Sequence, residues 1–584
     1  MRRELAIVVA AMALLGLVSP AAASAASDLN VQGSVTQVYV TGADPGEPLK
    51  LINRKGKRVR ADEAGALGGL VFRHVAPGKG YRVRDGAGQF TRRVAVSSTR
   101  AKPKSTSIYD QTLPTEGYGY LKTRDQTSLA ISVRTPSGPP PYPTVVEYSG
   151  YGYADPDGPE SGISPILNLL GYAVVDVNMR GTGCSGGAFD FFERLQALDG
   201  YDVVETVARQ PWVMHNKVGM VGVSYGGISQ LFVGATRPPS LAAITPLSVI
   251  DNTATTLYPG GILNTGFALE WAKDRVDDAK PASETTGQPW AWERIQDGDQ
   301  TCAANQVLHT SAVDLIRKTY NNRFYRPRVA DPLNPSRFVQ KISAPTYLAC
   351  QFNDEQTGAH CPNLVNRVGA KRRWSTLTNG LHTDSLDPQT FNRWFDFLEL
   401  YVAQRKPALP PGIEAFAPLL YQTVMGVPGV QIPPDPIREQ PSYEAAKALF
   451  ESQPRVRVLF DNGAGGAPGK PVPGFERSFK TFPPRGVKPR SLFFREGGVL
   501  AKKPPRKRGT DSFAWEKGSR PADNFTGTNT GSGDLWTDNP SYDWLQPPAG
   551  KSLSYVSAPL GADTFVLGSG AVHAWVKANV PDVD

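Results

Sequence analysis

Two patterns of apolar and polar residues divide the chain. Residues 28–100 alternate apolar and polar positions in short runs such as VTQVYVTG, with Gly, Pro and Asp between the runs. This alternation predicts a small antiparallel β-sandwich. From about residue 117 the apolar runs become continuous, as in TVVEYS (144–149) and YAVVDVNM (172–179). Strands without alternation are typical of a parallel sheet that is covered on both faces.

Helical patterns lie between these continuous runs, and residues 389–403 form the clearest amphipathic example. The alternation of strands and helices predicts an α/β domain over residues 108–408. It is interrupted over about residues 250–340, which are rich in Trp, Asn and Asp and contain helical pieces such as FALEWAKDRV. This interruption predicts a helical cap inserted between two strands.

After about residue 408, Pro, Gly and strand-like runs dominate again. Residues 409–584 are therefore predicted to form a second β domain, whose last elements are SLSYVSAPL, DTFVLGS and AVHAWVKANV. The printed chain stops a few residues after the last of these runs. We expect a β domain that ends there to be incomplete.

The first residues are typical of a secretory signal peptide. Arg2 and Arg3 precede the apolar run Leu5–Val18, and small residues follow in AAASAASD (21–28). An N-terminal membrane anchor is the weaker alternative, because the apolar run is short for a span of about 20 residues. We expect residues 1–25 to be a signal peptide, no membrane span after its cleavage, and a protein that is secreted or held in the cell envelope.

The composition fits a globular protein, with 40% hydrophobic residues among 584. The net charge of +9 is concentrated in RKGKRVR (54–60) and AKKPPRKRG (501–509). These are typical of solvated basic loops, and no stretch resembles a nucleic-acid-binding module. We expect no nucleic-acid partner.

The four cysteines permit two disulfides in an oxidising compartment. Cys350 and Cys361 bracket a short loop and make a reasonable pair, which would leave Cys184 with Cys302. None has the C-x-x-C spacing of a zinc site. The pairing itself depends on geometry that the sequence does not contain.

The stretch KVGMVGVSYGG (217–227) contains the strongest chemical motif. Gly222, Ser224 and Gly226 match G-x-S-x-G, the nucleophile elbow, in which a strand turns sharply into a helix. Glycines on either side avoid a steric clash at that turn. A predicted strand precedes the motif and an amphipathic helix follows it, so we interpret Ser224 as a nucleophile. The alternative is an incidental turn in a glycine-rich chain.

A serine nucleophile needs a base and a residue that orients the base. The order on such a fold is Ser, then Asp or Glu, then His. His382 follows the strand-like RRWSTLT and is the predicted base, whereas His360 lies in the predicted cysteine loop. Asp354 follows the strand PTYLACQ and is the predicted acid, with Glu355 as its rival. The alternative interpretation of Asp354 is a turn-forming residue.

The oxyanion of the tetrahedral intermediate needs hydrogen-bond donors. The first predicted donor is the backbone N–H of Tyr225, which follows the nucleophile. The second is expected in the loop YSGYGY, which supplies Tyr148, Tyr151 and Tyr153. An aromatic turn without catalytic role is the alternative for this loop.

Several of these stretches together resemble a known family. The sequence is similar to the X-Pro dipeptidyl-peptidase-like serine hydrolases (peptidase family S15, CocE/NonD), with cocaine esterase and α-amino-acid ester hydrolase as relatives. The stretches that carry the resemblance are YSGYGYADP (148–156), NMRGTGCSGG (178–187), DGYDVVETVARQPW (199–212), KVGMVGVSYGG (217–227), and the pair PTYLACQFND and NGLHTD.

The resemblance implies an α/β-hydrolase domain, a helical cap after the sixth strand and a C-terminal jelly-roll. It implies the triad Ser224, Asp354 and His382, and Tyr151 as the position matching the second oxyanion donor. The chain departs from the family in two places. Phe352-Asn353 stands where members often have Trp-Tyr before the acid, and SYGG stands where the α-amino-acid ester hydrolases have SYEG.

These residues predict a secreted serine hydrolase that acts on an ester, an amide or a short peptide without a cofactor or metal. Cap aromatics could form an acyl pocket, or could simply pack the cap; they are Phe267, Trp271 and Trp290. A peptidase would need a carboxylate for the substrate amine, for which Glu270 and Asp274 are available. The rival hypotheses are a cell-envelope acyltransferase with the same triad and a non-catalytic binding protein.

Overall fold

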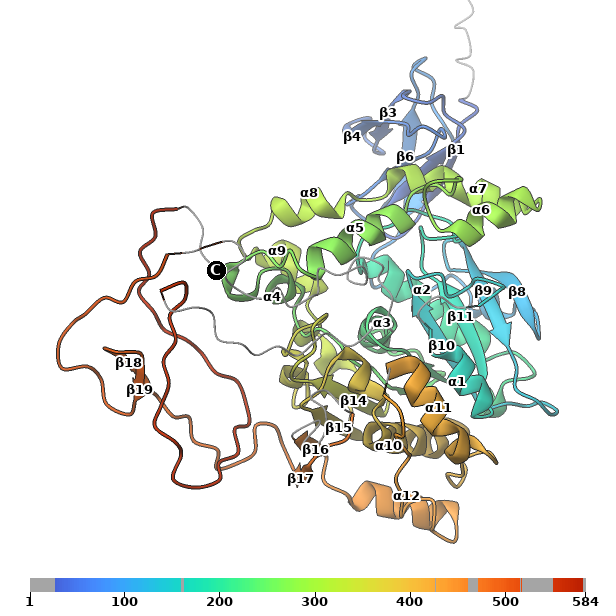
Figure 1. Ribbon diagram of the computed structural model, residues 1–584. Helices are drawn as coiled ribbons and strands as arrows, with labels where there is room; N and C mark the ends of the chain where they lie inside the picture. Colours follow the sequence, from blue (N-terminus) through green and yellow to red (C-terminus); the bar gives the residue numbers. More distant parts are fainter. Residues whose placement is uncertain are drawn as a thin grey trace, which may run out of the picture. The chain divides into compact units, whose positions relative to one another are not determined.

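The structure of the protein is a computed structural model, which describes residues 27–158, 162–425, 427–460, 471–514, 516 and 550–580 (Figure 1). The predicted signal peptide, residues 1–25, lies outside the described residues. The chain divides into two compact units, Met1–Ala101 and Lys102–Asp584.

The first unit contains two small antiparallel sheets. Their strand orders are β1-β2-β5 and β4-β3-β6-β7. Apolar side chains from both sheets, such as Val40 and Val83, form one buried cluster, as the alternation predicts. The strands are β1 (Asn30–Gly33), β2 (Val38–Thr41), β3 (Pro48–Ile52), β4 (Arg58–Glu63), β5 (Leu70–Phe72), β6 (Gly78–Arg84) and β7 (Val94–Val96).

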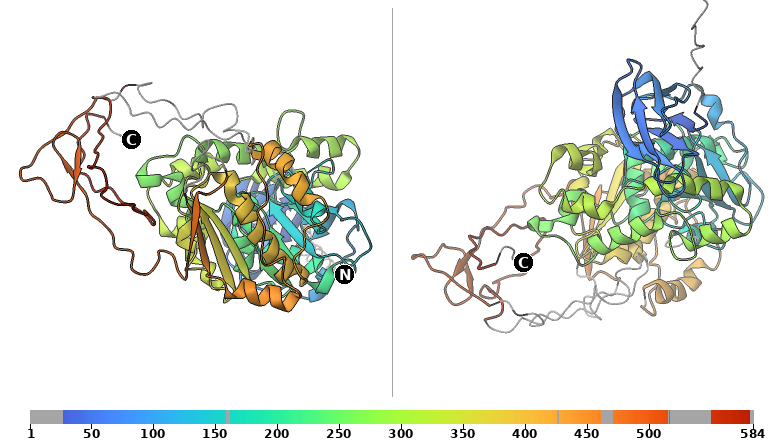
Figure 2. Two further views of the ribbon diagram at one scale, coloured as in Figure 1. Left: turned by 60° about the horizontal axis from the view of Figure 1, so that its bottom comes forward. Right: turned by 90° about the horizontal axis from the view of Figure 1, so that it is seen from above.

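A ten-stranded mixed sheet lies at the centre of the second unit (Figure 2). Its order is β17-β16-β15-β14-β13-β12-β10-β11-β9-β8. The central strands run parallel, and β8, β9 and β17 pair antiparallel with their neighbours. The strands are β8 (Gly117–Lys122), β9 (Ser128–Arg134), β10 (Thr144–Ser149), β11 (Ala173–Asn178), β12 (Val218–Val221), β13 (Leu241–Ile244), β14 (Thr346–Gln351), β15 (Arg373–Thr378), β16 (Val456–Phe460) and β17 (Phe475–Phe479).

Helices cover both faces of this sheet, which explains its continuous apolar strands. Consecutive residues of β10, Val145 and Val146, belong to two different buried clusters. The cluster of Val146 includes α2 (Arg194–Val207) and α3 (Tyr225–Gly234). The cluster of Val145 includes further helices, namely α1 (Ser164–Leu169), α10 (Pro388–Leu398), α11 (Ile413–Met425) and α12 (Tyr443–Ser452).

The strand order reverses at β10, and this reversal places the site. β10 pairs with β11 on one side and with β12 on the other. The chain leaves β10 toward β11 on one side and leaves β12 toward β13 on the other. The two connections therefore diverge at the carboxyl ends of β10 and β12. A crevice at such a switch point is where open α/β sheets bind ligands.

The motifs NMRGTGCSGG and DGYDVVE meet in a buried ion-pair network. Arg180 is fully buried and donates to Asp199 at 2.8 and 2.7 Å and to Asp125 at 3.1 Å. Burial raises the pKa of Asp199 to about 7, although the charge of Arg180 opposes the rise. These motifs hold the loop after β11 against α2, so their role here is structural.

Short helices between β13 and β14 form the predicted helical insertion. Residues 253–330 contain α4 (Thr253–Leu257), α5 (Ala268–Asp278), α6 (Pro289–Gln296), α7 (Gln300–Asn305), α8 (Leu315–Tyr320) and α9 (Pro327–Ala330). We call this region the cap.

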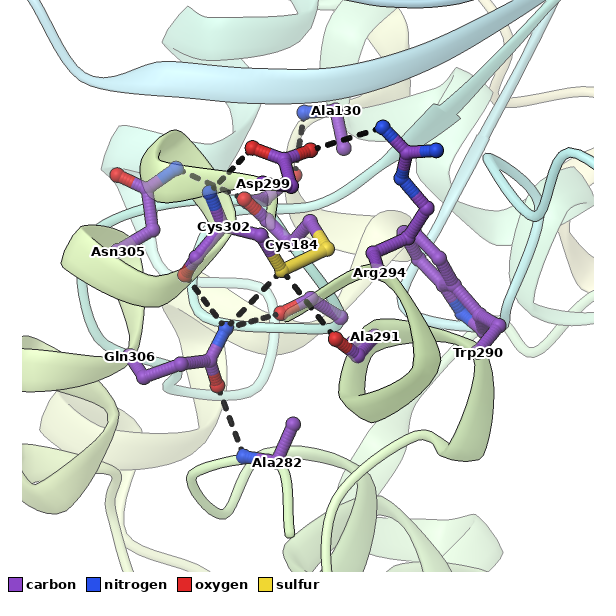
Figure 3. Close-up of a disulfide and its surroundings, with 12 residues drawn as sticks. Ala130, Cys184, Ala282, Trp290, Ala291, Arg294, Asp299, Cys302, Asn305 and Gln306 are labelled. Atoms are coloured by element: carbon purple, nitrogen blue, oxygen red, sulfur yellow. Dashed lines mark hydrogen bonds and ion pairs between the residues drawn. A yellow bond between two sulfur atoms is a disulfide. The ribbon is translucent and has the colours of Figure 1, made fainter. Parts of the chain in front are cut away.

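Both cysteine pairs that the sequence favours are disulfides. Cys184–Cys302 joins the loop after β11 to α7 of the cap, and Cys350–Cys361 closes a loop after β14. Figure 3 shows Cys184–Cys302 beside Trp290 and Gln306, whose Nε2 donates to the backbone oxygens of Gly183 and Cys302. The first disulfide therefore fixes the cap to the sheet.

Removing Cys184–Cys302 should destabilise the protein more than removing Cys350–Cys361. The two bonds span 118 and 11 residues of sequence, and a longer closed loop restrains the unfolded chain more. We expect the Cys184→Ser/Cys302→Ser variant to lose roughly 2–5 kcal/mol of unfolding free energy. Denaturant titration of the two double-serine variants measures the difference, and an equal or larger loss for the short loop would contradict it.

The α/β unit extends beyond the predicted boundary at residue 408. Residues 409–460 contain α11, α12 and β16, and β16 and β17 extend the central sheet. This corrects the prediction of a β domain starting at residue 409. Pro and Gly are frequent here, but α11 and α12 carry apolar stripes that pack on the sheet, and such packing decides the structure.

The predicted jelly-roll is not seen among the described residues of the C-terminal region. Residues 471–514 and 550–580 contain β17, the hairpin of β18 (Phe493–Arg495) and β19 (Val499–Ala501), and a bridge from Val499 to Val556. Beyond the bridge most apolar side chains are exposed, with Trp575 at 99%, and Leu567 is partly buried against the core cluster of the sheet. These runs have strand-like patterns, but within the described residues they have no neighbouring strand to pair with.

The described part of the chain has no helix that combines the length and the apolar character needed to span a bilayer.

Candidate active site

Ser224 occupies a sharp turn between β12 and α3. Its backbone has φ 58° and ψ −121°, a region that non-glycine residues rarely adopt. Such strain persists only where the surrounding structure imposes it. The turn places the Ser224 side chain at the carboxyl edge of the sheet and at the start of a helix.

The glycines around Ser224 are required by close contacts. A Cβ at Gly222 would lie 2.8 Å from the carbonyl carbon of Gly226. A Cβ at Gly226 would lie 2.9 Å from the Tyr153 hydroxyl, and one at Gly227 would lie 2.5 Å from the oxygen of Leu247. These distances are shorter than carbon contacts allow, so the elbow packs too tightly for larger residues.

His382 and Asp354 meet from the loops after β15 and β14. His382 Nδ1 lies 2.9 Å from both carboxylate oxygens of Asp354. Asp354 also accepts hydrogen bonds from the backbone N–H of Thr357 at 2.7 Å and from its hydroxyl at 2.6 Å. His382 is fully buried and Asp354 is nearly so. Thr357 therefore holds the Asp354 carboxylate, and the carboxylate in turn holds the His382 imidazole.

The environment favours the protonated form of His382. Burial lowers the pKa of His382, but the charge and hydrogen bond of Asp354 and the charge of Glu355 outweigh it, so the pKa is raised above 6.5. Burial also acts to raise the pKa of Asp354, yet His382 and the Thr357 hydrogen bonds hold that pKa below its usual value. The pair is suited to stabilising an imidazolium beside a carboxylate.

Two further side chains hold the backbone of His382. Glu355, the rival acid, accepts the His382 backbone N–H at 3.0 Å, whereas the ring Nδ1 is hydrogen-bonded to Asp354. Ser248 donates its hydroxyl to the His382 carbonyl at 2.8 Å. The structure thus gives the two neighbouring acids different positions, with Asp354 on the ring and Glu355 on the backbone.

The ring nitrogen of His382 that points away from Asp354 is the atom that can take a proton. His382 Nε2 is buried and has no hydrogen-bond partner among the described residues. The other ring nitrogen, Nδ1, donates its N–H to the Asp354 carboxylate. This hydrogen bond fixes the neutral tautomer in which Nε2 can accept a proton.

Tyr151 lies beside Ser224 in the loop after β10. Its hydroxyl accepts the indole N–H of Trp271 at 2.9 Å, and the Ser224 side chain is near enough to lower the pKa of Tyr151. The guanidinium of Arg275, also on α5, stands 4.7 Å from the centre of the Tyr151 ring. Burial raises the pKa of Tyr151, while the charge of Arg275 and the hydrogen bond from Trp271 oppose the rise. Of the loop's three tyrosines, Tyr151 is the one whose pKa is affected by the Ser224 side chain.

A cavity of about 140 Å³ opens beside the elbow. Ser224 and Tyr225 line it from the sheet side, and most of its remaining wall is apolar and comes from the cap. Phe267 and Trp271, both predicted as pocket residues, are part of this wall. An apolar group of a substrate can therefore lie in this cavity next to Ser224.

Comparison with known proteins agrees with this geometry. Residues 125–384 match the family X-Pro dipeptidyl-peptidase (S15 family). The matched segment is somewhat less than half of the 584 residues. It contains the elbow, the acid, the base, the tyrosine loop and the cap, so the family match covers every element of the site described above.

Curated relatives share shorter stretches with this chain. A provisionally named serine esterase of Mycobacterium bovis is 34% identical over 105 residues, which is 18% of this chain and 17% of that protein. Cocaine esterase of Rhodococcus sp. is 31% identical over 153 residues, 26% of each chain. The matched stretches thus span about a quarter or less of these relatives.

Among solved structures, a CocE/NonD family hydrolase from Staphylococcus aureus is similar, with a TM-score of 0.48 and 16% identity. The similarity covers 69% of this chain and 66% of that one.

Trp290 is not among the residues that line the cavity beside Ser224, which corrects its prediction as a pocket residue. It is nearly buried, donates its indole N–H to Gln288 at 3.0 Å, and packs in the cluster around Cys184 and Cys302 (Figure 3). Its neighbour Gln288 donates to the Gly150 oxygen at 2.8 Å. Trp290 therefore packs the cap, which was the alternative interpretation of the cap aromatics.

Several site residues were not found by sequence reasoning. Thr357 and Ser248 support the acid and the base, and Arg275 faces the Tyr151 ring. Thr357 lies three residues after Asp354, a spacing that suits a hydrogen bond within one turn. Ser248 and Arg275 reach the site only through the fold, and no local motif marks them.

Proposed function

We propose that this chain is a serine hydrolase that cleaves esters through Ser224, His382 and Asp354. The observation that carries the proposal is the buried contact of His382 Nδ1 with both oxygens of Asp354, at the sheet edge where Ser224 begins α3. A serine at a strained turn, a base and an orienting acid are the parts that acyl transfer needs. The S15 match over the same residues supports the proposal.

The reaction follows from the roles of these atoms. Ser224 Oγ attacks the ester carbonyl carbon while His382 Nε2 takes its proton. The acyl C–O bond then breaks, and His382 returns the proton to the leaving alcohol. Water attacks the acyl-enzyme by the same route, releasing the acid and restoring Ser224. Asp354 stabilises the imidazolium in both steps, consistent with the raised pKa of His382.

Two donors are proposed to bind the oxyanion. The first is the backbone N–H of Tyr225. Because Tyr225 is the first residue of α3, this N–H has no acceptor within the helix. The Tyr151 hydroxyl is the second. Because Trp271 donates to the Tyr151 oxygen, the tyrosine keeps its own proton for the substrate. Trp271 is thus a positioning residue for Tyr151.

Removing the Tyr151 hydroxyl should lower kcat and leave KM nearly unchanged. The hydrogen bond that it supplies strengthens as charge develops on the oxygen, so Tyr151→Phe is expected to cost about 10²–10³ in kcat. Tyr153→Phe removes a hydroxyl from the same loop and is the control, with kcat expected near that of the native protein. Similar losses in both variants would contradict the role of Tyr151.

The role of Trp271 is tested in combination with Tyr151. Trp271→Phe keeps an aromatic ring but removes the indole donor, so kcat should fall. In the Tyr151→Phe background the same change should lower kcat no further, because the hydroxyl that it positions is gone. Losses that multiply in the double variant would show that Trp271 acts independently of Tyr151.

The cavity favours an ester over an X-Pro peptide as substrate. A free N-terminal ammonium needs a carboxylate, and no Asp or Glu is among the described residues that line the cavity. Glu270 is half-exposed and pairs with Lys273 at 2.6 Å, and Asp274 is not part of the wall. Parallel assays on p-nitrophenyl butyrate and Ala-Pro-p-nitroanilide test this. Faster turnover of the anilide would contradict the ester preference.

We also propose that the protein is secreted. The two disulfides favour an oxidising compartment, and residues 1–25 have the pattern of a signal peptide. N-terminal sequencing of the exported protein should begin after Ala23 or Ala25. Recovery of the intact N-terminus in the cytoplasm would contradict this.

A further inference from the structure

The cavity beside Ser224 has an uneven distribution of charge. Among the described residues that line it, only Lys318 and Arg326 are charged, and the rest of the wall is apolar or uncharged. Lys318 forms an ion pair with Asp190, which neutralises it. The side chain of Arg326 has no hydrogen bond or ion pair with another described residue, so its positive charge is uncompensated.

Arg326 lies at the open end of the cavity. It is exposed, and its neighbours Phe324 and Tyr325 also line the cavity while keeping 67% and 44% of their surface exposed. Ser224, by contrast, is 5% exposed. The cavity wall therefore includes a buried part at Ser224 and an exposed part around Arg326.

The chain around Arg326 strengthens this positive charge. Residues 315–330 contain five basic residues and no acidic one, while the flanking Asp314 caps α8 and the flanking Asp331 pairs with Arg337 and accepts the Tyr325 hydroxyl. A low-dielectric apolar wall focuses the field of such a segment into the cavity. An anionic group entering the cavity would be attracted to its mouth, and a cationic group would be repelled.

We propose that the cavity binds the acyl part of an ester whose acyl chain ends in a carboxylate. The chain would lie along the apolar wall, with the ester carbonyl at Ser224 and the carboxylate on the guanidinium of Arg326. A guanidinium matches a carboxylate with two parallel hydrogen bonds, which a neutral chain end cannot form. Hydrolysis would break the acyl C–O bond, add one water, and release a dicarboxylic acid and the alcohol. This inference rests on the proposed ester hydrolysis.

The test compares matched p-nitrophenyl esters that differ only at the chain end. Butyrate, hexanoate and octanoate esters are the neutral series, and the mono-esters of succinate, adipate and suberate are the carboxylate series. At the chain length that best spans the cavity, we expect kcat/KM for the carboxylate ester to exceed that of its neutral partner about tenfold or more. Arg326→Gln should abolish this preference, so that within this variant each carboxylate ester is hydrolysed no faster than its neutral partner.

The control is Arg328→Gln, because Arg328 belongs to the same basic segment but does not line the cavity. It should keep the preference. A preference that is absent at every length, or that survives Arg326→Gln, would overturn the inference. These outcomes leave ester hydrolysis intact, whereas neutral esters without Ser224-dependent turnover would overturn the proposed function itself. Added salt should weaken the preference, since the attraction is electrostatic.

Discussion

Ser224→Ala should lower kcat for ester hydrolysis by about 10⁴–10⁶, by analogy with dissected triads. The alanine removes the oxygen that attacks the carbonyl, and the described residues that line the cavity include no other serine and no cysteine. The fold should be unaffected, because Ser224→Ala removes only the Oγ atom and the surrounding structure continues to hold the strained turn. Steady-state rates on p-nitrophenyl butyrate measure the loss.

The control is Ser229→Ala. Ser229 lies further along α3, is buried, and donates its hydroxyl to the Gly226 oxygen at 2.9 Å. Its replacement should cost some stability but little kcat. Near-native turnover in Ser224→Ala, or an equal loss in Ser229→Ala, would remove the basis for a serine nucleophile at the elbow.

Asp354→Asn should lower kcat by about 10⁴. The amide fills the same space, but it cannot stabilise the imidazolium, and it allows the wrong tautomer of His382. Glu355→Gln is the matched comparison, since Glu355 holds the backbone N–H of His382 and not its ring. We expect a much smaller loss for Glu355→Gln. A reversed order of the two losses would assign the catalytic acid to Glu355.

We also expect Asp354→Asn to shift the pH profile of the reaction. His382 must be neutral to accept the proton, so activity falls as the pH drops through its pKa. Burial alone would lower that pKa, but Asp354 raises it above 6.5, and the acidic limb of kcat/KM in the native protein should lie above pH 6.5. Without the Asp354 charge, the limb should move to lower pH. An unchanged limb in Asp354→Asn would mean that His382 is not the titrating group.

The turn at Ser224 and the meeting of Asp354 with His382 were predictable from the sequence, because each depends on a residue's place directly after a strand. Gly222 and Gly226 are needed within the same turn as Ser224, and the short contacts that a Cβ at either position would make explain why. Asp354 and His382 each follow a predicted strand, so the parallel sheet brings them to one edge. Only the choice between Asp354 and Glu355 needed the structure, since adjacent residues share every sequence argument.

Long-range packing decided what the sequence could not. Trp271 and Trp290 have the same residue type and both lie in the cap, yet one donates to Tyr151 and the other packs beside Cys184–Cys302. The amphipathic stripes of α11 and α12 were hidden by frequent Pro and Gly in their surroundings. Each of these outcomes depends on partners distant in the chain, which periodicity does not identify.

The central claim is that Ser224 is an activated nucleophile, and covalent labelling tests it most directly. The purified protein would be treated with a fluorophosphonate and mapped by mass spectrometry of its peptides. We predict one adduct, on Ser224, that forms more slowly in Asp354→Asn and is absent in Ser224→Ala. Labelling of another residue, or no labelling of a protein that hydrolyses p-nitrophenyl butyrate, would contradict this account.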